Sequence, residues 1–231
     1  MEFSREDLKQ RLEQVRERMR KAAQKAGRPA EAVKLVAVSK TKPAEMIKAA
    51  LELGQLDFGE NYAQEFRDKA AELADPRIRW HYIGSLQRNK VKYLIGKAAL
   101  IHSIDSAGLL EELEKRAGGQ GLKMPILLEV KLSEEQTKTG IDPASLIALA
   151  ETAFKSKAVE LRGLMTMPPY FADPELARPY YVRLRRVRDD LEAKLGIKLP
   201  ELSMGMSNDF EVAVEEGATY VRVGTAIFGE R

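Results

Sequence analysis

Cysteine is absent from this sequence of 231 residues. Its absence excludes disulfides, zinc sites built from thiolates and cysteine nucleophiles. The chain has only two histidines, His81 and His102, so histidine-rich metal sites are poorly supplied and we expect no metal centre. An excess of charge is also lacking, because 38 basic residues stand against 35 acidic ones, a formal net charge of +3. This nearly equal number of basic and acidic residues indicates neither nucleic acid nor a membrane surface as the main partner.

Long apolar runs are missing too. No stretch approaches the roughly 20 residues that a membrane span requires, and the first residues, MEFSRE, lack the apolar core of a signal peptide. We therefore expect a cytoplasmic protein with no membrane segment. Hydrophobic residues make up 44% of the chain and charged residues 32%, which predicts a sizeable core under a charged surface.

The order of the predicted elements is one leading helix followed by eight strand-then-helix units. Residues 4–26 carry an apolar stripe at spacings of three and four, with Ser4 as a cap and Gly27 as the stop. The expected strands are 33–38, 56–59, 80–84, 100–103, 125–130, 159–164, 199–204 and 220–223. The expected helices are 43–53, 60–74, 87–95, 106–117, 143–155, 174–194 and 208–215, with a short helical tail from Thr225.

Eight such units predict a (β/α)8 TIM barrel, which fits the typical length of roughly 200–250 residues. We expect one domain over residues 1–231, in which residues 1–27 form the leading amphipathic helix. A doubly wound open sheet is the rival fold. The count of eight, with the sequence ending just after the last strand, favours closure.

Chemistry in such a barrel is built at the carboxyl ends of the strands. Lys40 follows the strand 33–38, where loss of solvation lowers a lysine's pKa and makes its amine a nucleophile toward a carbonyl. The loops after the last two strands commonly bind phosphate in barrels, and Ser207, Gly224 and Thr225 lie there. An amine on one side and a phosphate site on the other describe a phosphorylated aldehyde. Pyridoxal 5'-phosphate has both handles, and we expect it as the cofactor.

Several stretches at these strand ends resemble the pyridoxal phosphate homeostasis protein family, whose members bind pyridoxal phosphate and are built like the barrel domain of alanine racemase. The stretches are VAVSKTKP at 36–43, FGENY at 58–62, WHYIGSLQRNK at 80–90, LMTM at 164–167 and LSMGMSNDF at 202–210. The resemblance covers nearly the whole chain. It departs from the family at Lys131, where asparagine is usual, and this leaves the role of the fifth strand's loop open although Lys138-Thr139-Gly140 matches.

The resemblance implies a role for each of eight residues. Lys40 would form the Schiff base and Arg222 would face the pyridine nitrogen. The phosphate would be held by Ser207, Gly224 and Thr225, and the ring would be surrounded by Asn61, His81 and Met165. The residues themselves leave alternatives open, since His81 is equally explained as a packed, hydrogen-bonded side chain, Met165 as core packing and Arg222 as a structural ion-pair residue.

The same features favour a carrier over a catalyst. An arginine cannot give up its proton, so it keeps the pyridine nitrogen neutral and makes the cofactor a poorer electron sink. The sequence lacks the additional β-domain of the resembling racemases and offers no clear second acid or base, so we assign no catalytic residue. We expect a non-catalytic monomer that carries and buffers pyridoxal phosphate on Lys40, contributes to its intracellular homeostasis and releases it to apo-enzymes. The alternatives are a pyridoxal phosphate-dependent amino-acid racemase or related enzyme, and a cofactor-free Schiff-base aldolase or lyase acting on a sugar phosphate.

Overall fold

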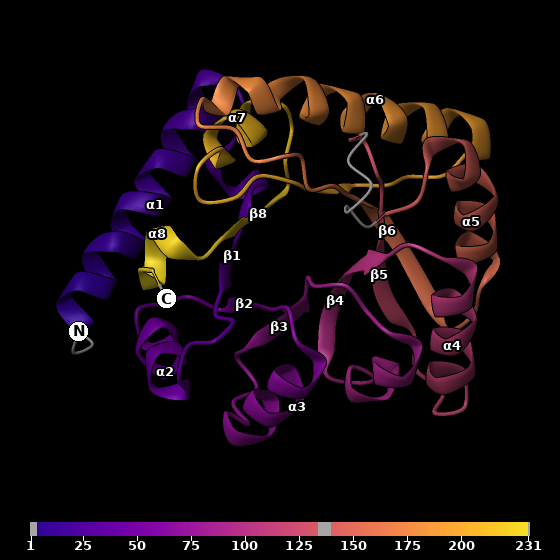
Figure 1. The fold of residues 1–231 in the computed structure, drawn as a ribbon, viewed down its shortest axis with the longest axis horizontal. Coiled ribbons are helices and arrows are strands. Elements are labelled where there is room, and N and C mark those ends of the chain that lie inside the picture. Colours follow the sequence, from indigo (N-terminus) through magenta and orange to yellow (C-terminus); the bar gives the residue numbers. More distant parts are fainter. Residues whose placement is uncertain (1–3, 134–139, 231) are drawn as a thin grey trace.

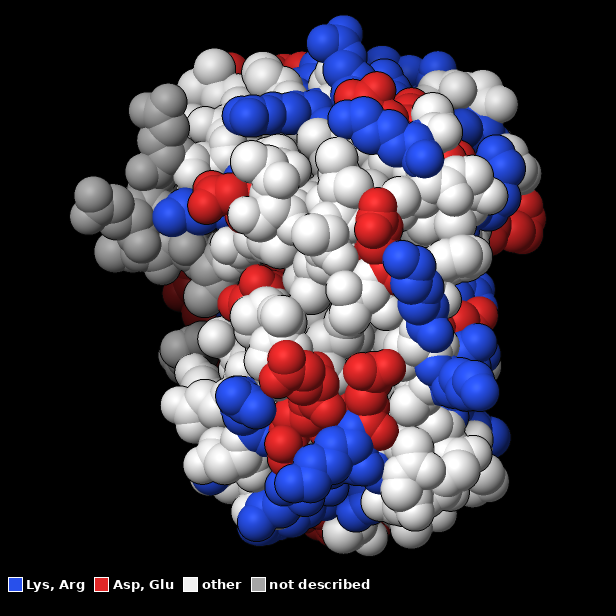
Figure 2. All heavy atoms as spheres, turned by 90° about the vertical axis from the view of Figure 1, so that its right-hand side faces the viewer, with Lys and Arg blue, Asp and Glu red and all other residues white. Residues whose placement is uncertain are grey.

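The structure, a computed structural model, describes residues 4–133 and 140–230. The predicted match at Lys138-Thr139 therefore lies outside the described residues. Within those ranges no helix is both long enough and apolar enough for a membrane span. Figure 2 shows basic and acidic side chains next to one another on the side that lies at the right in Figure 1.

Parallel strands form a closed barrel in chain order, and β1 pairs with β8 to complete the ring (Figure 1). This confirms the predicted (β/α)8 TIM barrel. Within the described residues the strands are β1 (Lys34–Val38), β2 (Asp57–Glu60), β3 (Arg79–Tyr82), β4 (Ala98–Ile104), β5 (Met124–Glu129), β6 (Val159–Met165), β7 (Glu201–Ser203) and β8 (Tyr220–Val223).

Helices surround the strands (Figure 1). Within the described residues they are α1 (Arg5–Lys25), α2 (Ala44–Glu52), α3 (Ala63–Glu72), α4 (Ala107–Gly118), α5 (Pro143–Lys155), α6 (Arg178–Leu195), α7 (Phe210–Glu215) and α8 (Thr225–Phe228). Three short 3-10 helices are η1 (Ala30–Ala32), η2 (Arg88–Tyr93) and η3 (Pro174–Ala177).

Two predicted helices differ in the structure. The α-helix expected at 87–95 is the 3-10 helix η2. The helix expected at 174–194 is divided into η3 and α6, because Pro179 has no N–H to donate to the carbonyl of Glu175 and a continuous α-helix cannot pass through that point.

The leading helix α1 closes the outer layer. Ser4 caps it by accepting a hydrogen bond from the backbone N–H of Asp7 at 3.3 Å. The predicted stripe is buried except for its last member, Ala26, which is the half-buried C-cap. The helix packs against α7 and α8, next to β8 and β1, as Figure 1 also shows. It therefore covers the side of the barrel where the short α8 leaves room.

Two apolar clusters form the core. The larger lies between the strands and the helices. The smaller one consists of one residue from each of five strands, namely Val36, Leu100, Leu127, Met165 and Tyr220. Buried polar side chains from several strands, among them His81, His102, Ser203 and Arg222, are likewise excluded from solvent. The strand ends can thus present polar groups to a site without opening the barrel to water.

Candidate functional site

A cavity of about 300 Å³ lies at the carboxyl ends of the strands. Six of the eight predicted site residues line it: Lys40, Asn61, Ser207, Arg222, Gly224 and Thr225. His81 and Met165 are not among its lining residues. Ligand pockets in proteins run from about 300 to 1,000 Å³, so this cavity suits a small ligand.

The turn that carries Lys40 is held by a buried ion pair. Lys69 on α3 donates hydrogen bonds to the backbone carbonyl of Ser39 at 2.7 Å and to Oε1 of Glu60 at 2.8 Å. The hydroxyl of Ser39 donates to the same carboxylate oxygen at 2.7 Å. Burial raises the pKa of Glu60, against the opposing attraction of Lys69. The residue next to Lys40 is thus fixed through both its backbone and its side chain.

On the other side of Lys40, Thr41 adopts a left-handed backbone conformation with φ of 64°. It is the only non-glycine residue with positive φ among those that the structure describes. Its N–H donates to Glu65 at 2.6 Å, and Glu65 also accepts from Lys69 at 2.7 Å. Such a conformation costs free energy and persists where its surroundings enforce it. Lys69, Glu60 and Glu65, here called the Lys69 cluster, therefore shape the turn on both sides of Lys40.

Beside this turn, where β8 pairs with β1, the Ser207 hydroxyl meets the start of α8. Its oxygen accepts hydrogen bonds from the N–H groups of Gly224 at 3.2 Å and Ala226 at 3.4 Å. A hydroxyl that accepts two bonds still has its own proton to donate. A Cβ added to Gly224 would lie 3.3 Å from the carbonyl oxygen of Val38, so β1 approaches closely here. The segment therefore offers the hydroxyl proton of Ser207 to an anion.

Asn61 enters the cavity from the end of β2, and its backbone is fixed by β3. The hydroxyl of Tyr82 donates to its carbonyl oxygen at 3.1 Å. Gly84 packs so closely that a Cβ there would lie 2.2 Å from that same oxygen. The side-chain Oδ1 of Asn61 is buried and has no hydrogen-bond partner among the described residues. A buried acceptor without a donor is costly, and a ligand hydroxyl would relieve that cost.

Arg222 reaches the cavity from β8. Its guanidinium donates to Oγ of Ser203 at 2.6 Å and to the carbonyl oxygen of Thr166 at 2.9 Å. The residue is 3% exposed, and burial lowers its pKa from the ordinary value of 12.5. A guanidinium carries five N–H donors, so donors beyond these two bonds remain for a ligand.

The structure places His81 and Met165 away from the cavity lining. His81 lies deeper, hydrogen-bonded to Asp57 at 2.9 Å and to His102 at 2.9 Å. Met165 is fully buried in the smaller apolar cluster. Met167, two residues further along the chain, lines the cavity. Met167 lies beyond the end of β6, packs against the same cluster and is therefore nearer the site.

Sequence reasoning missed several lining residues: Val38, Ile83, Met167, Tyr170, Met206, Asn208 and Asp209. Most lie in stretches already singled out, so their position after a strand was the available signal. Tyr170 lies in the loop after β6 and is 77% exposed. Lys131, half-buried after β5, does not line the cavity. Among the described residues no group of three or more histidine, aspartate or glutamate side chains could hold a metal ion.

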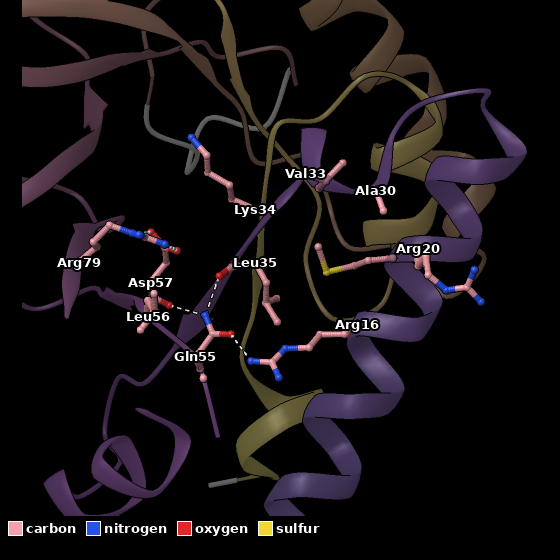
Figure 3. A pocket seen from close by; sticks show the side chains of 12 residues that line it. Arg16, Arg20, Ala30, Val33, Lys34, Leu35, Gln55, Leu56, Asp57 and Arg79 are labelled. Carbon is pink, nitrogen blue, oxygen red and sulfur yellow. Dashed lines mark hydrogen bonds and ion pairs between the residues drawn. The ribbon is translucent and has the colours of Figure 1, made fainter. Parts of the chain in front are cut away.

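A second cavity, of about 350 Å³, lies at the amino ends of the strands (Figure 3). Its basic side chains already have partners. Arg16 donates to Leu53 and Gln55, and Arg79 pairs with Asp57. Its amine, on Lys34 at the amino end of β1, is hydrogen-bonded to Tyr220 at 3.2 Å and paired with Glu201 at 3.6 Å. The cavity at the carboxyl ends is the candidate site.

Comparisons with known proteins agree with this geometry. Residues 10–231 match the family model described as "Alanine racemase, N-terminal domain". A protein of Aquifex aeolicus called pyridoxal phosphate homeostasis protein is 48% identical over 222 residues, which are 96% of this chain and 97% of that protein. The structure of PipY from Synechococcus elongatus with pyridoxal phosphate bound superposes with a TM-score of 0.86 at 38% identity, covering 96% of this chain and 100% of that one. Alanine racemase of Corynebacterium glutamicum shares the fold, with a TM-score of 0.73, 16% identity and coverage of 95% of this chain and 62% of that one.

Proposed function

The chain belongs to the pyridoxal phosphate homeostasis proteins, within the alanine racemase N-terminal domain family, and on that premise we propose that it binds pyridoxal 5'-phosphate at Lys40 and carries and buffers it. One observation supports this most directly. Lys40, Ser207 and Gly224, which follow three different strands, line the same cavity. A ligand with an aldehyde and a phosphate can engage both.

The residues present fit this cofactor. The buried Oδ1 of Asn61 has no donor among the described residues and suits the ring hydroxyl. The hydroxyl proton of Ser207, whose oxygen already accepts from the N–H groups of Gly224 and Ala226, suits a phosphate oxygen. Spare donors on Arg222 suit the pyridine nitrogen, which is an acceptor when unprotonated. The PipY structure, at 38% identity, holds the same cofactor.

When bound, pyridoxal phosphate supplies an aldehyde that condenses reversibly with an amine. Each residue of this chain then has a part. Lys40 supplies the amine, and the Lys69 cluster holds its turn in place. Ser207, Gly224 and Thr225 anchor the phosphate. Arg222 donates to the pyridine nitrogen and, as a permanent cation, disfavours its protonation.

We propose a carrier rather than a catalyst. A neutral pyridine nitrogen withdraws electrons weakly, which disfavours carbanion chemistry. Racemisation would also need a second acid or base to return a proton to the opposite face of the substrate. The one phenol among the described lining residues, Tyr170, is 77% exposed and open to solvent.

We propose that the protein is a monomer, as the resemblance to its family implies. We further propose that it works in the cytoplasm and that apo-enzymes are the recipients of its cofactor.

Transfer to an apo-enzyme tests the carrier function. The loaded protein is mixed with an apo-acceptor, with free pyridoxal phosphate and a scavenging enzyme as the reference. We expect the acceptor to gain activity in the presence of the scavenger, because the cofactor is protected until it is handed over. Activation that the scavenger abolishes completely would contradict delivery.

Deuterium exchange tests the enzyme alternative. The loaded protein is incubated with amino acids in heavy water, with Tyr170→Phe as the comparison. We expect no incorporation at Cα above that of free pyridoxal phosphate. Incorporation at turnover rates that falls in Tyr170→Phe would instead establish a racemase-like activity.

A further inference from the structure

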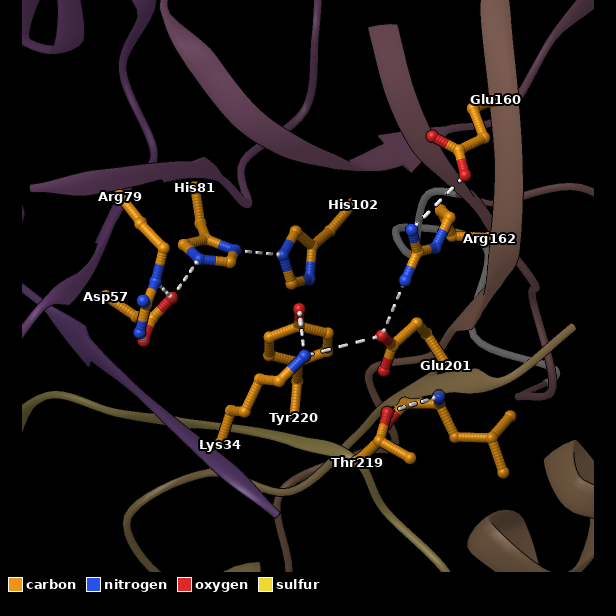
Figure 4. A network of polar contacts seen from close by, with 11 residues as sticks. Lys34, Asp57, Arg79, His81, His102, Glu160, Arg162, Glu201, Thr219 and Tyr220 are labelled. Atoms are coloured by element: carbon orange, nitrogen blue, oxygen red, sulfur yellow. Dashed lines mark hydrogen bonds and ion pairs between the residues drawn. The ribbon is translucent and has the colours of Figure 1, made fainter. Parts of the chain in front are cut away.

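A line of hydrogen bonds crosses the inside of the barrel from Arg222 toward the opposite end. Arg222 donates to Ser203 at 2.6 Å, and Ser203 lies 2.8 Å from Nδ1 of His102. Nε2 of His102 lies 2.9 Å from Nδ1 of His81, and Nε2 of His81 lies 2.9 Å from Asp57. Figure 4 shows the Asp57 end of this line, where Arg79 also holds the carboxylate.

The chemistry of the groups fixes the direction of every bond in the line. Arg222 has no acceptor, so Ser203 accepts from it. Among the described residues, the hydroxyl proton of Ser203 has one acceptor, Nδ1 of His102. Burial lowers the pKa of His102 well below its ordinary value, and the neighbouring cation of Arg222 lowers it further, so this ring is neutral. With Nδ1 accepting, the proton of His102 is on Nε2 and is donated to His81.

The other end agrees with this direction. Nδ1 of His81 accepts, so its proton is on Nε2 and is donated to Asp57. Burial raises the pKa of Asp57, but hydrogen bonds from Arg79 and His81 outweigh it and leave the pKa at about 2. The carboxylate is therefore ionised at neutral pH and can only accept. Between a donor-only group at one end and an acceptor-only group at the other, this is the arrangement in which the buried hydroxyl proton of Ser203 also has an acceptor.

We infer that Ser203, His102, His81 and Asp57 form a directional relay of positioning residues that orients the guanidinium of Arg222 toward the cofactor. Every donor in the relay points away from Arg222, so each acceptor lone pair faces the cation and stabilises it inside the barrel. Together with the carbonyl of Thr166, which accepts from the other terminal nitrogen, the relay fixes which N–H groups of Arg222 are engaged and which remain for a ligand. Its four members are between 0% and 6% exposed, so the relay is largely shielded from solvent.

The relay adds to the proposed function. It rests on that function only for the identity of the ligand that Arg222 faces. Its far end, Asp57 with Arg79, lines the second cavity at the amino ends of the strands (Figure 3). Tyr220 keeps the two imidazoles in place, with ring centroids 5.4 Å from His81 and 5.6 Å from His102. The orientation of Arg222 thus depends on groups from one end of the barrel to the other.

The first test needs no cofactor. Because His81 and His102 are the only histidines, nitrogen NMR of protein labelled with ¹⁵N-histidine reports on both rings without ambiguity. We expect two neutral rings at neutral pH, each protonated on Nε2, with ring protons that exchange slowly with solvent. A proton on Nδ1 of either ring, or a doubly protonated ring, would overturn the relay.

The second test breaks the relay next to Arg222. In Ser203→Ala we expect Nδ1 of His102 to move to the shift of a nitrogen without a donor. We also expect about tenfold weaker binding of pyridoxal phosphate and a shifted absorption band, because Arg222 keeps only its hydrogen bond to Thr166 and is less firmly oriented. Ser156→Ala is the control, since it removes another buried hydroxyl, at the end of α5 and outside the relay.

The outcomes separate the two proposals. Wild-type protein that fails to bind pyridoxal phosphate would contradict the proposed function, while the histidine spectra would still decide the relay. Wild-type affinity and an unshifted band in Ser203→Ala would overturn the relay and leave the proposed function standing.

Discussion

Replacing Lys69 with methionine removes one charge of a buried pair and leaves the other without compensation. Lys69 is 7% exposed and Glu60 is fully buried, and a second carboxylate oxygen of Glu60 already has no partner among the described residues. Breaking a buried pair on one side costs about 3–5 kcal/mol. For a chain of this size each kcal/mol lowers Tm by about 2–4 °C, so we expect a decrease of about 6–20 °C.

The double variant Glu60→Gln/Lys69→Met distinguishes a lost charge pair from lost packing. An amide without charge is far cheaper to bury, so we expect the double variant to recover most of the stability. Lys155→Met is the control, because Lys155 and Glu151 form an exposed pair at 3.9 Å and its loss costs less than about 1 kcal/mol. Free energies of unfolding from urea titrations provide the comparison.

The stability lost in Lys69→Met should also depend on pH, in a direction set by the pKa of Glu60. The pKa of Glu60 is raised by burial, so its contribution to stability is present below the ordinary value of 4.5 and is lost as the pH rises through the folded-state pKa. Without Lys69 the pKa rises further. The deficit of Lys69→Met should therefore shrink as the pH falls toward 4.5. A variant within 1 kcal/mol of wild type, or a deficit independent of pH, would refute the reasoning.

Two further predictions follow from close packing and from charge. Gly84→Ala would place a Cβ 2.2 Å from the carbonyl oxygen of Asn61, so we expect a loss of about 1–3 kcal/mol and weaker binding of pyridoxal phosphate, whereas Gly118→Ala, with its nearest contact at 3.6 Å, should change neither measurement appreciably. The folded protein lowers the pKa of Asp57 from 3.8 to about 2, so the stabilisation by this carboxylate is present above pH 3.8 and is lost as the pH falls through about 2. The stability of Asp57→Asn should therefore change less with pH across that window than the stability of wild type. Parallel stability profiles in acid unfolding would count against the assignment.

The barrel was predictable because short strand-like runs, of which Leu35–Val38 is the clearest, alternate eight times with segments of helical character. The position of Lys40 followed from the same pattern, since a strand end defines the site edge. The side of the strand that each residue faces was not predictable. Parallel strands buried on both faces lack the alternation that would assign His81 and Met165 to a depth in the barrel. The bond between His102 and Ser203 joins residues 101 apart in the chain, and no local pattern records it.

The central claim is that Lys40 holds pyridoxal phosphate, and reduction with borohydride followed by peptide mapping tests it most directly. The wild type, Lys40→Ala and the control Lys42→Ala are each loaded with the cofactor, reduced and digested. Lys42 is a suitable control because it is a half-buried lysine close to Lys40 in the chain, and it donates to the carbonyl of Glu230 at 2.8 Å. We expect one pyridoxyl adduct on Lys40 in wild type and in Lys42→Ala, and none at that position in Lys40→Ala, together with loss of the reducible absorption band. An adduct that maps to other lysines while Lys40 stays unmodified, or a band that survives in Lys40→Ala, would contradict the account.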